Sequence, residues 1–344
     1  MSHAPSRKAA GDHRIAMSES TESHEAEAFG HRSVLLDPVV EVLREVPAGW
    51  VADCTVGGGG HAAALLEAAP HVSVLGIDLD GDARQAATAR LAPFGPRAHI
   101  VAARFDALAD VVRGAGVHAL AGALFDLGVS SHQLDTAARG FSHRLDGPLD
   151  MRLDARSTGR TAAELVNDTS LDELTELLRR GGEDRNARRI AKAIVAARPV
   201  DTTAQLAAVV SSAIPHADRR RGGNPLNVPF QAIRIAVNEE LDIIEPAVRA
   251  ALDLLVVGGR LVVLSFHSGE DRIVKRVLAT ACAVADPGPR GLPLHASASE
   301  PPPFRHLRHV AKHAPPEEIA RNRRAASVRM RAVQRVYDGP IERT

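Results

Sequence analysis

The stretch that decides the fold is Val51-Ala52-Asp53-Cys54-Thr55-Val56-Gly57-Gly58-Gly59-Gly60-His61. A short apolar run precedes the four glycines, and an alanine- and leucine-rich segment follows them. Glycines at such a turn let the backbone adopt positive φ and approach a ligand, while the next helix offers unpaired N–H groups to an anion. The apolar run 72–77 then ends in Asp78, whose carboxylate suits a ribose diol. The pattern predicts a strand, a glycine turn, a helix and a second strand around an adenosine-containing cofactor.

The glycine pattern alone is a weak signal. Gly57, Gly59 and Ala62 satisfy the G-x-G-x-x-G/A pattern of dinucleotide-binding turns, but a tight turn without any ligand also uses glycine. Each glycine costs roughly 0.5–1 kcal/mol relative to alanine in regular structure. Four glycines in a row therefore favour a ligand.

Apolar runs of strand length alternate with helical segments up to residue 126, which predicts a doubly wound α/β fold with a parallel sheet and helices on both faces. Strand character returns at 260–266, after a long helix predicted over 230–255. The alternating segment 327–336 predicts an edge strand. The other predicted strands are 50–53, 72–78, 99–102 and 121–126.

Three parts of the chain differ in pattern. Residues 1–29 are rich in Ser, His, Glu and Ala without apolar periodicity, which predicts a disordered tail. Residues 136–227 show amphipathic helices and no clear strand, which predicts a helical insertion domain. The main domain is expected over 30–135 and 228–344.

The composition limits the class of protein. The chain has 344 residues, 45% apolar content and a formal net charge of zero. Cys54 and Cys282 stand alone, form no disulfide framework and have no metal-ligand spacing, so we expect no metal site and a reducing, cytoplasmic setting. No apolar run approaches the length of a membrane span, so we expect no membrane partner.

Positive charge is concentrated in three runs although the net charge is zero, and such patches favour contact with phosphates. The alternative is a solvated helix face, or arginines paired with Glu183 and Asp184. The runs comprise Arg179, Arg180, Arg185, Arg188, Arg189 and Lys192; then Arg219, Arg220 and Arg221; then Arg305, Arg308, Lys312, Arg321, Arg323, Arg324, Arg329 and Arg331.

A polar cluster follows the fourth predicted strand. Asp126, Ser130 and Ser131 come after a buried apolar run, and ligands of open parallel sheets bind beyond the carboxyl ends of the strands. These three residues are therefore candidates for the reacting centre. The alternative is a capped turn, in which Asp and Ser are common.

Several motifs follow one another in order: His31-Arg-Ser-Val-Leu-Leu36, Asp53 to His61, Phe125-Asp-Leu-Gly-Val-Ser-Ser131, Arg139-Gly-Phe-Ser142, Asp146-Gly-Pro-Leu-Asp-Met-Arg152, Gly182-Glu-Asp-Arg185, Phe230-Gln-Ala-Ile-Arg-Ile235 and Ser265-Phe-His-Ser-Gly-Glu-Asp-Arg272. Through them the chain resembles the ribosomal RNA small subunit methyltransferase H family from residue 31 to about 336. The resemblance implies a class I S-adenosylmethionine-dependent methyltransferase domain with a helical insertion. It also implies methylation of the exocyclic N4 of a cytidine in the decoding region of 16S rRNA in the small ribosomal subunit.

The resemblance assigns roles to residues of this chain. It implies that S-adenosyl-L-methionine contacts Gly59, Gly60, His61, Asp78, Phe105, Asp126 and Gln133. We assign the catalytic role to Asp126, Ser130 and Ser131, which lie where an acceptor for the amine is needed. We assign RNA binding by the insertion to Arg185, Arg188, Arg189 and Lys192.

The chain departs from the family pattern at two places. Residues 224–229 read Asn-Pro-Leu-Asn-Val-Pro, where relatives carry a His-Pro segment with basic and Thr residues. Gly269 replaces the usual Leu between His-Ser and Glu-Asp-Arg, and we expect this change to loosen the start of the following helix.

Two other functions compete with this hypothesis. An NAD-dependent oxidoreductase fits the glycine pattern, but the chain ends in an alternating strand and has no separate substrate domain. A non-catalytic RNA-binding assembly factor fits the charge, but Gly59, Asp78 and Asp126 are intact. Comparison of S-adenosylmethionine binding with NAD binding tests the oxidoreductase. Methyl transfer to 16S rRNA tests the assembly factor. The sequence leaves open a homodimer, the identity of a general base, and free rRNA or assembled subunit as the substrate.

Overall fold

The computed structural model describes residues 33–219, 224–283, 301–308 and 310–339. The tail predicted over 1–29 and most of the loop predicted over 286–303 lie outside the described residues.

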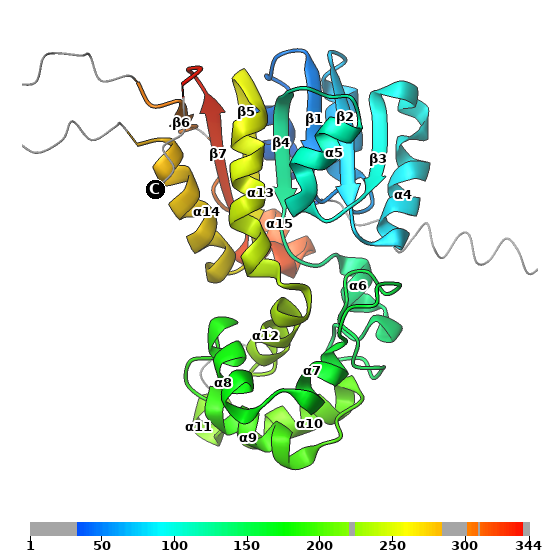
Figure 1. Ribbon diagram of the computed structural model, residues 1–344, viewed down its shortest axis with the longest axis vertical. Helices are drawn as coiled ribbons and strands as arrows, with labels where there is room; N and C mark the ends of the chain where they lie inside the picture. Colours follow the sequence, from blue (N-terminus) through cyan, green and yellow to red (C-terminus); the bar gives the residue numbers. More distant parts are fainter. Residues whose placement is uncertain (1–32, 220–223, 284–300, 309, 340–344) are drawn as a thin grey trace, which may run out of the picture. The chain divides into compact units, whose positions relative to one another are not determined.

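The described residues form a seven-stranded sheet in the order β3-β2-β1-β4-β5-β7-β6 (Figure 1). The pairs from β3 to β5 are parallel, whereas β7 is antiparallel to both β5 and β6. The predicted parallel sheet is therefore confirmed. The strands are β1 (Gly49–Asp53), β2 (Val72–Asp78), β3 (Ala98–Ala102), β4 (Leu120–Asp126), β5 (Leu255–Ser265), β6 (Phe304–His306) and β7 (Arg329–Arg335).

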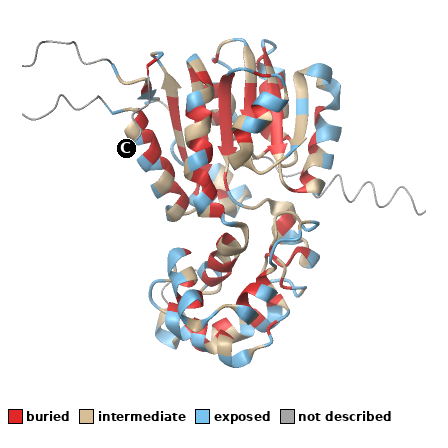
Figure 2. Ribbon diagram, viewed as in Figure 1, coloured by how far each residue is buried: buried red, intermediate tan, exposed pale blue. Residues whose placement is uncertain are grey.

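Helices cover both faces of the sheet (Figure 1). Successive residues of each strand point to opposite faces, so Val51 and Val262 join one core while Ala52 and Val263 join the other. Figure 2 shows the central strands mostly buried, the outer strand β3 more exposed, and the helices buried on the side that faces the sheet. The first face carries α2 (Leu36–Leu43), α3 (Gly60–Ala68) and α4 (Gly81–Leu91); the second carries α5 (Leu108–Gly114), α13 (Glu240–Leu254) and α14 (Ser268–Ala281).

Two sequence predictions about this domain are wrong. The last strand is not at the edge, because β6 pairs with its outer side. A three-residue strand has no periodicity to detect, and its pairing is a long-range contact. The helix predicted over 230–255 is two helices, α12 (Asn227–Asn238) and α13, because Glu239 has φ of +54° and ends the α12 hydrogen-bond ladder.

A third hydrophobic core lies among the helices of the insertion. Its buried residues run from Phe141 to Ile233 and so include α12. A Cβ at Gly181 would lie 2.2 Å from the Ala232 Cβ, so glycine permits close packing of α8 against α12. We propose that the helical domain extends through α12. Its other helices are α7 (Ala162–Asp168), α8 (Leu171–Arg180), α9 (Ala187–Ala197), α10 (Thr203–Ala213) and α11 (His216–Arg219).

Candidate active site

Three carboxylates end three neighbouring strands of the sheet. Asp53 ends β1 and lies opposite Gly76 of β2 and Leu124 of β4, so Asp78 and Asp126 each extend two residues further. By strand alternation all three side chains point to the face that carries α2 and α3. The chain leaves β1 for β2 on one side and later returns to β4 on the other, which makes this edge the switch point where such sheets bind ligands.

The glycine loop connects β1 with α3. Gly57 and Gly59 have φ of +51° and +77°, which glycine adopts without strain. The N–H of Gly57 donates to Asp78 Oδ2 at 2.9 Å, and the N–H of Asp80 donates to Asp78 Oδ1 at 2.9 Å. Each carboxylate oxygen keeps a second lone pair, which leaves Asp78 able to accept hydrogen bonds from a diol.

Gly60 is required by a close approach in the same loop. A Cβ at this position would lie 2.2 Å from the Ser33 hydroxyl oxygen, so a larger residue would force the Ser33 side chain, in the segment before α2, to move. This segment also carries the Val34 carbonyl that contacts His61.

Asp126 has an unused acceptor at the centre of the site. Its Oδ1 is buried and has no hydrogen-bond partner among the described residues, while its Oδ2 lies 3.8 Å from His61 Nδ1. Burial, together with the smaller effect of the negative charges of Asp53 and Glu270, raises the pKa of this carboxyl to about 8. An unpaired buried oxygen of this kind is costly unless a ligand or water uses it.

His61 faces Asp126 as a neutral ring. Its Nε2 lies 2.9 Å from the Val34 carbonyl oxygen, which can only accept, so Nε2 carries the proton. Nδ1 is then unprotonated and directed at Asp126. Burial lowers the pKa of His61 to about 4, although the bond to Val34 opposes this shift.

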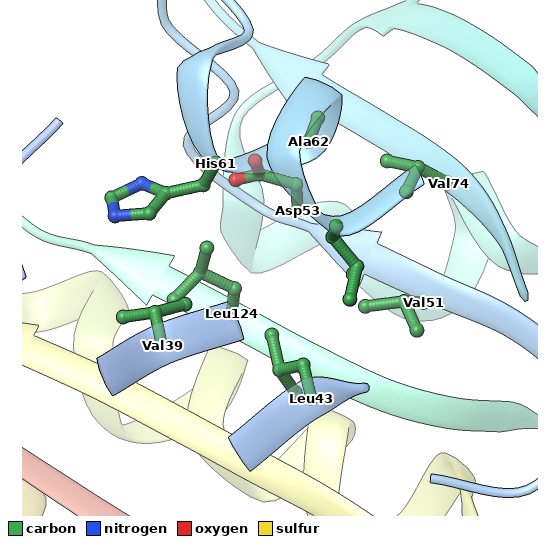
Figure 3. Close-up of a pocket in the computed structure, with 9 residues that line it drawn as sticks. Val39, Leu43, Val51, Asp53, His61, Ala62, Val74 and Leu124 are labelled. Carbon is green, nitrogen blue, oxygen red and sulfur yellow. The ribbon is translucent and has the colours of Figure 1, made fainter. Parts of the chain in front are cut away.

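Asp53 was quoted in the sequence but received no role there. Its side chain is buried, and burial raises its pKa to about 7, with the charge of Asp78 adding to the shift and a bond from the Thr55 N–H opposing it. With His61 it lines a small cavity behind the glycine loop (Figure 3). The cavity is about the size of one water molecule, far too small for a nucleoside. Its other lining residues are Val39, Leu43, Val51, Ala62, Leu65, Val74 and Leu124.

Gln133 lies in a buried polar network that the sequence did not predict. Its Oε1 accepts from the Ser130 N–H at 2.9 Å, and its Nε2 donates to Asp80 Oδ2 at 2.7 Å. Arg139 also donates to this oxygen, at 2.7 Å, and spans to the carbonyl of Leu153. Burial opposes ionisation of Asp80, but the bonds from Gln133 and Arg139 outweigh it and lower the pKa.

This network connects the ribose-side loop after β2 with the start of the insertion. Arg139 belongs to the Arg-Gly-Phe-Ser motif, which was the only sequence signal for it. No spacing rule pairs residues 80 and 139.

The remaining predicted site residues occupy the same edge. Ser130 caps α6 (Ser131–Asp135), because its hydroxyl oxygen accepts the Gln133 N–H. The capping role that the sequence left open is thus present at Ser130. Phe105 follows β3 and meets Phe125 edge to face, with ring centroids 5.8 Å apart.

The predicted RNA-binding cluster lies on and just before α9 of the insertion. Arg185, Arg188, Arg189 and Lys192 are all exposed, and Arg188 pairs with Asp172 at 2.9 Å. Within the described ranges none of the four pairs with Glu183 or Asp184. Three of these cations are therefore available to an external anion.

The expectation that Gly269 loosens the next helix is wrong. The ring Nδ1 of His267 accepts from the N–H groups of Gly269 and Glu270, and Glu270 accepts from the N–H of Phe266 at 2.7 Å. A Cβ at residue 269 would lie 3.0 Å from His267 Nδ1, so glycine gives this cap its room. In the departing segment 224–229, Asn227 Oδ1 contacts the ring of His143 at 2.9 Å.

Between pH 6.5 and 8 the free energy of unfolding of the ligand-free protein is expected to fall. Asp53 and Asp126 keep their protons in the native state up to about pH 7 and 8, whereas the unfolded chain has lost them above 3.8. Stability is thus complete at low pH and decreases by up to about 1.4 kcal/mol per pH unit for each carboxyl. His61 acts with the opposite sign only below its unfolded pKa of 6.5. Urea unfolding at several pH values measures this, and a profile that rises over this window would contradict it.

The fold and site together define a class I S-adenosylmethionine-dependent methyltransferase, because a parallel sheet with an antiparallel β7 carries a glycine loop and an acidic β2 end. The chain belongs to the MraW methylase family, whose model matches residues 28–336. None of the described helices combines the length and apolar content of a bilayer span.

Curated relatives are similar over most of their length. A protein of Mycobacterium sp. (strain KMS) is 47% identical over 321 residues, which cover 91% of this chain and 86% of the relative. One of Frankia alni is 48% identical over 317 residues, or 90% and 96%. Both are named "Ribosomal RNA small subunit methyltransferase H". A solved structure described as a putative rRNA-methylase from Clostridium thermocellum aligns with 89% of this chain and 99% of its own, at 11% identity and a TM-score of 0.41, a likeness too weak to support any conclusion.

Asp78→Ala is expected to weaken S-adenosylmethionine binding by about 1.5–3 kcal/mol, the usual contribution of hydrogen bonds to a charged group. The variant also loses the anchor for the N–H groups of Gly57 and Asp80. Isothermal calorimetry measures the affinity, with Asp82→Ala, an exposed carboxylate at the start of α4, as control. Unchanged affinity in a folded Asp78→Ala protein would remove Asp78 from the ribose site.

Proposed function

We propose that this protein methylates the exocyclic N4 of a cytidine in the decoding region of 16S rRNA, with S-adenosylmethionine as methyl donor. The observation that carries the proposal is the unpartnered Oδ1 of Asp126 at the switch point of the sheet. The names of the curated relatives support small-subunit rRNA as substrate. The base and its position rest on the family resemblance of the motifs.

The residues at the sheet edge fit the cofactor. Asp78 offers two acceptors to the ribose, and Phe105, which is partly exposed, offers an apolar ring face to adenine. The positive-φ turn at Gly59 and the missing side chain at Gly60 leave the backbone of the loop open to the ligand. We assign His61 and Asp126 to the methionine end. We assign Gln133 to the wall of the pocket, held by Asp80.

When bound, S-adenosylmethionine supplies an electrophilic methyl group on a sulfonium. The protein has to place a weakly nucleophilic amine against it and accept the amine proton. Asp126 Oδ1 is the acceptor we assign, because it is the unpaired oxygen of the site. A cationic neighbour favours the ionised carboxylate and so works against the raised pKa of Asp126. We assign to Ser130 and Ser131 the role of orienting the amine through their backbone and hydroxyl groups.

Positioning contributes more to this reaction than the acceptor does. Orientation of two reactants supplies roughly 7–11 kcal/mol, whereas one preorganised polar group supplies roughly 2–4 kcal/mol. Cytosine N4 inside a helix is out of reach, so the target must be unpaired or flipped out of its stack. We assign the helical domain the task of holding the flanking strand.

Replacement of Arg185, Arg188, Arg189 and Lys192 by Ala is expected to weaken RNA binding and flatten its salt dependence, with cofactor affinity unchanged. Each lost phosphate contact reduces the slope of log affinity against log salt by about 0.7–0.9. Arg188 should contribute least, because Asp172 already neutralises it. Binding of a 16S fragment across a salt series measures the slopes. Parallel lines for wild type and variant would mean that the cluster touches no phosphate.

The proposal is tested by transfer of radiolabelled methyl to 16S rRNA, with the modified nucleotide mapped by mass spectrometry in cells with and without the protein. Free rRNA and small subunits are offered separately. No transfer to either substrate would overturn the proposal. Tight NAD binding without S-adenosylmethionine binding would support the oxidoreductase instead.

A homodimer and a cytoplasmic location stay predictions. Light scattering of the purified protein tests the first, and cell fractionation tests the second.

A further inference from the structure

A basic segment at residues 312–331 lies along the edge of the sheet that carries the candidate site. It contains α15 (Pro316–Arg321), the short helix η4 (Arg323–Ser327) and the start of β7. Residues 312–331 hold six Arg and Lys against two Glu, in a chain whose net charge is zero. Acidic residues elsewhere in the chain therefore balance the positive charge of this segment.

Contacts at three places fix the basic segment beside the site. Glu318 Oε1 accepts from the Leu35 N–H at 2.8 Å, next to the Val34 carbonyl that holds His61. Arg324 pairs at 2.9 Å with Asp135, at the end of α6. In addition, two arginines of β7 meet buried Asp271, which follows Glu270 at the start of α14: Arg329 at 3.1 Å and Arg331 at 2.7 Å. The segment is thus anchored on three elements that border Asp126.

Several cations of the segment remain available at this edge. Arg321 and Arg323 are exposed and make no ion pair within the described ranges. Arg329 keeps 54% of its side chain exposed although it contacts Asp271, and it shares that carboxylate with Arg331. Lys312 is exposed, and its carbonyl accepts the Met330 N–H, which places it beside the start of β7. One carboxylate for two arginines leaves net positive charge.

The insertion holds both paired and unpaired cations. Arg179 pairs with Glu176, Arg180 with Asp242 and Arg188 with Asp172, whereas Arg185, Arg189 and Lys192 make no ion pair among the described residues. In the basic segment, Arg321 and Arg323 likewise have no acidic partner among the described residues. Phosphates attract exposed, unpaired cations most strongly, since no internal partner has to be displaced.

We propose that the basic segment binds the phosphate backbone of the RNA strand that presents the target base. It forms a second contact surface, far along the chain from the insertion. This inference rests on the proposed function. Arg321 and Arg323 carry the contact, and the anchors at Asp135 and Asp271 hold it next to the reacting centre. The insertion then serves a different stretch of the same strand.

The test compares the full chain with the double variant R321A/R323A in binding to a labelled 16S rRNA fragment across a salt series. Loss of two phosphate contacts makes the slope of log affinity against log salt shallower by about 1.4–1.8. If the lines meet near 1 M salt, binding at 0.1 M is roughly 25- to 60-fold weaker. R321K/R323K keeps the charge and should restore the slope. R44A/R113A removes two exposed arginines near the opposite edge of the sheet and is the matched control.

The outcomes separate this inference from the function on which it rests. Wild type that neither binds nor methylates the rRNA would overturn the proposed function. Wild type that does both, with R321A/R323A parallel to it, would overturn the inference alone. Equal losses in R321A/R323A and R44A/R113A would mean a general charge effect and would also overturn it. So would weaker S-adenosylmethionine binding by R321A/R323A, because the segment would then act on the cofactor.

Discussion

Asp126→Asn is expected to lower the rate of methyl transfer about 10²–10³-fold while RNA and cofactor still bind. The substitution keeps the volume of the side chain but removes the charge and the basicity of Oδ1, which is the unpartnered buried acceptor of the site. Removal of one preorganised group or one general base costs about this much in other enzymes. The strand end itself should persist, because the Asp126 N–H is held by the Thr55 hydroxyl at 2.6 Å.

Single-turnover kinetics at saturating cofactor and RNA isolates the chemical step for Asp126→Asn. Glu270→Gln is the matched control. This carboxyl is also buried and its charge acts on Asp126, but its oxygens cap the start of α14. We expect Glu270→Gln to lower stability more than rate. An unchanged chemical rate in Asp126→Asn would remove Asp126 from the mechanism.

Arg139→Ala is expected to destabilise the protein by about 3–5 kcal/mol, because it leaves the charge of Asp80 buried without its cation. Both side chains of this pair are almost fully buried, at 8% and 5% exposure. Arg139 also holds the carbonyls of Arg152 and Leu153, so the variant loses the link between the sheet domain and the insertion. Cofactor affinity should fall as well, since Asp80 positions both Asp78 and Gln133.

Urea unfolding measures the loss in Arg139→Ala, with Arg113→Ala as control, because the Arg113–Asp110 pair is 78% exposed on both sides. Exposed pairs of this kind contribute about 0–1 kcal/mol. The double variant Asp80→Asn/Arg139→Met removes both charges and should recover much of the stability. A loss in Arg139→Ala no larger than that of Arg113→Ala would show that the pair does not hold the two parts together.

Asp126→Asn and Arg139→Ala test two carboxylates of the site, Asp126 and Asp80, which differ in their hydrogen-bond partners. Asp126 Oδ1 has no hydrogen-bond partner among the described residues, whereas the Asp80 carboxylate accepts from three donors, the Asp82 N–H, Gln133 and Arg139. The reacting centre thus keeps the Asp126 acceptor free. The carboxylate of Asp80, two residues beyond Asp78, is fully hydrogen-bonded and holds the wall of the pocket.

The sequence alone determined the sheet and the location of the site. The apolar runs of strand length and the glycine turn are local patterns, and in a parallel sheet they place the ends of β1, β2 and β4 at one edge. The positions of Asp78 and Asp126 followed from that alone. The order of the motifs indicated the family, and the family resemblance indicated the cofactor and the substrate.

Only the tertiary structure decided how these residues are charged and what holds them. The proton on His61 Nε2, the raised pKa of Asp53 and the free oxygen of Asp126 depend on burial by segments far away in sequence. The Arg139–Asp80 pair and the anchors of the basic segment are long-range contacts too. Periodicity and spacing describe neighbours along the chain, whereas desolvation and ion pairing depend on neighbours in space.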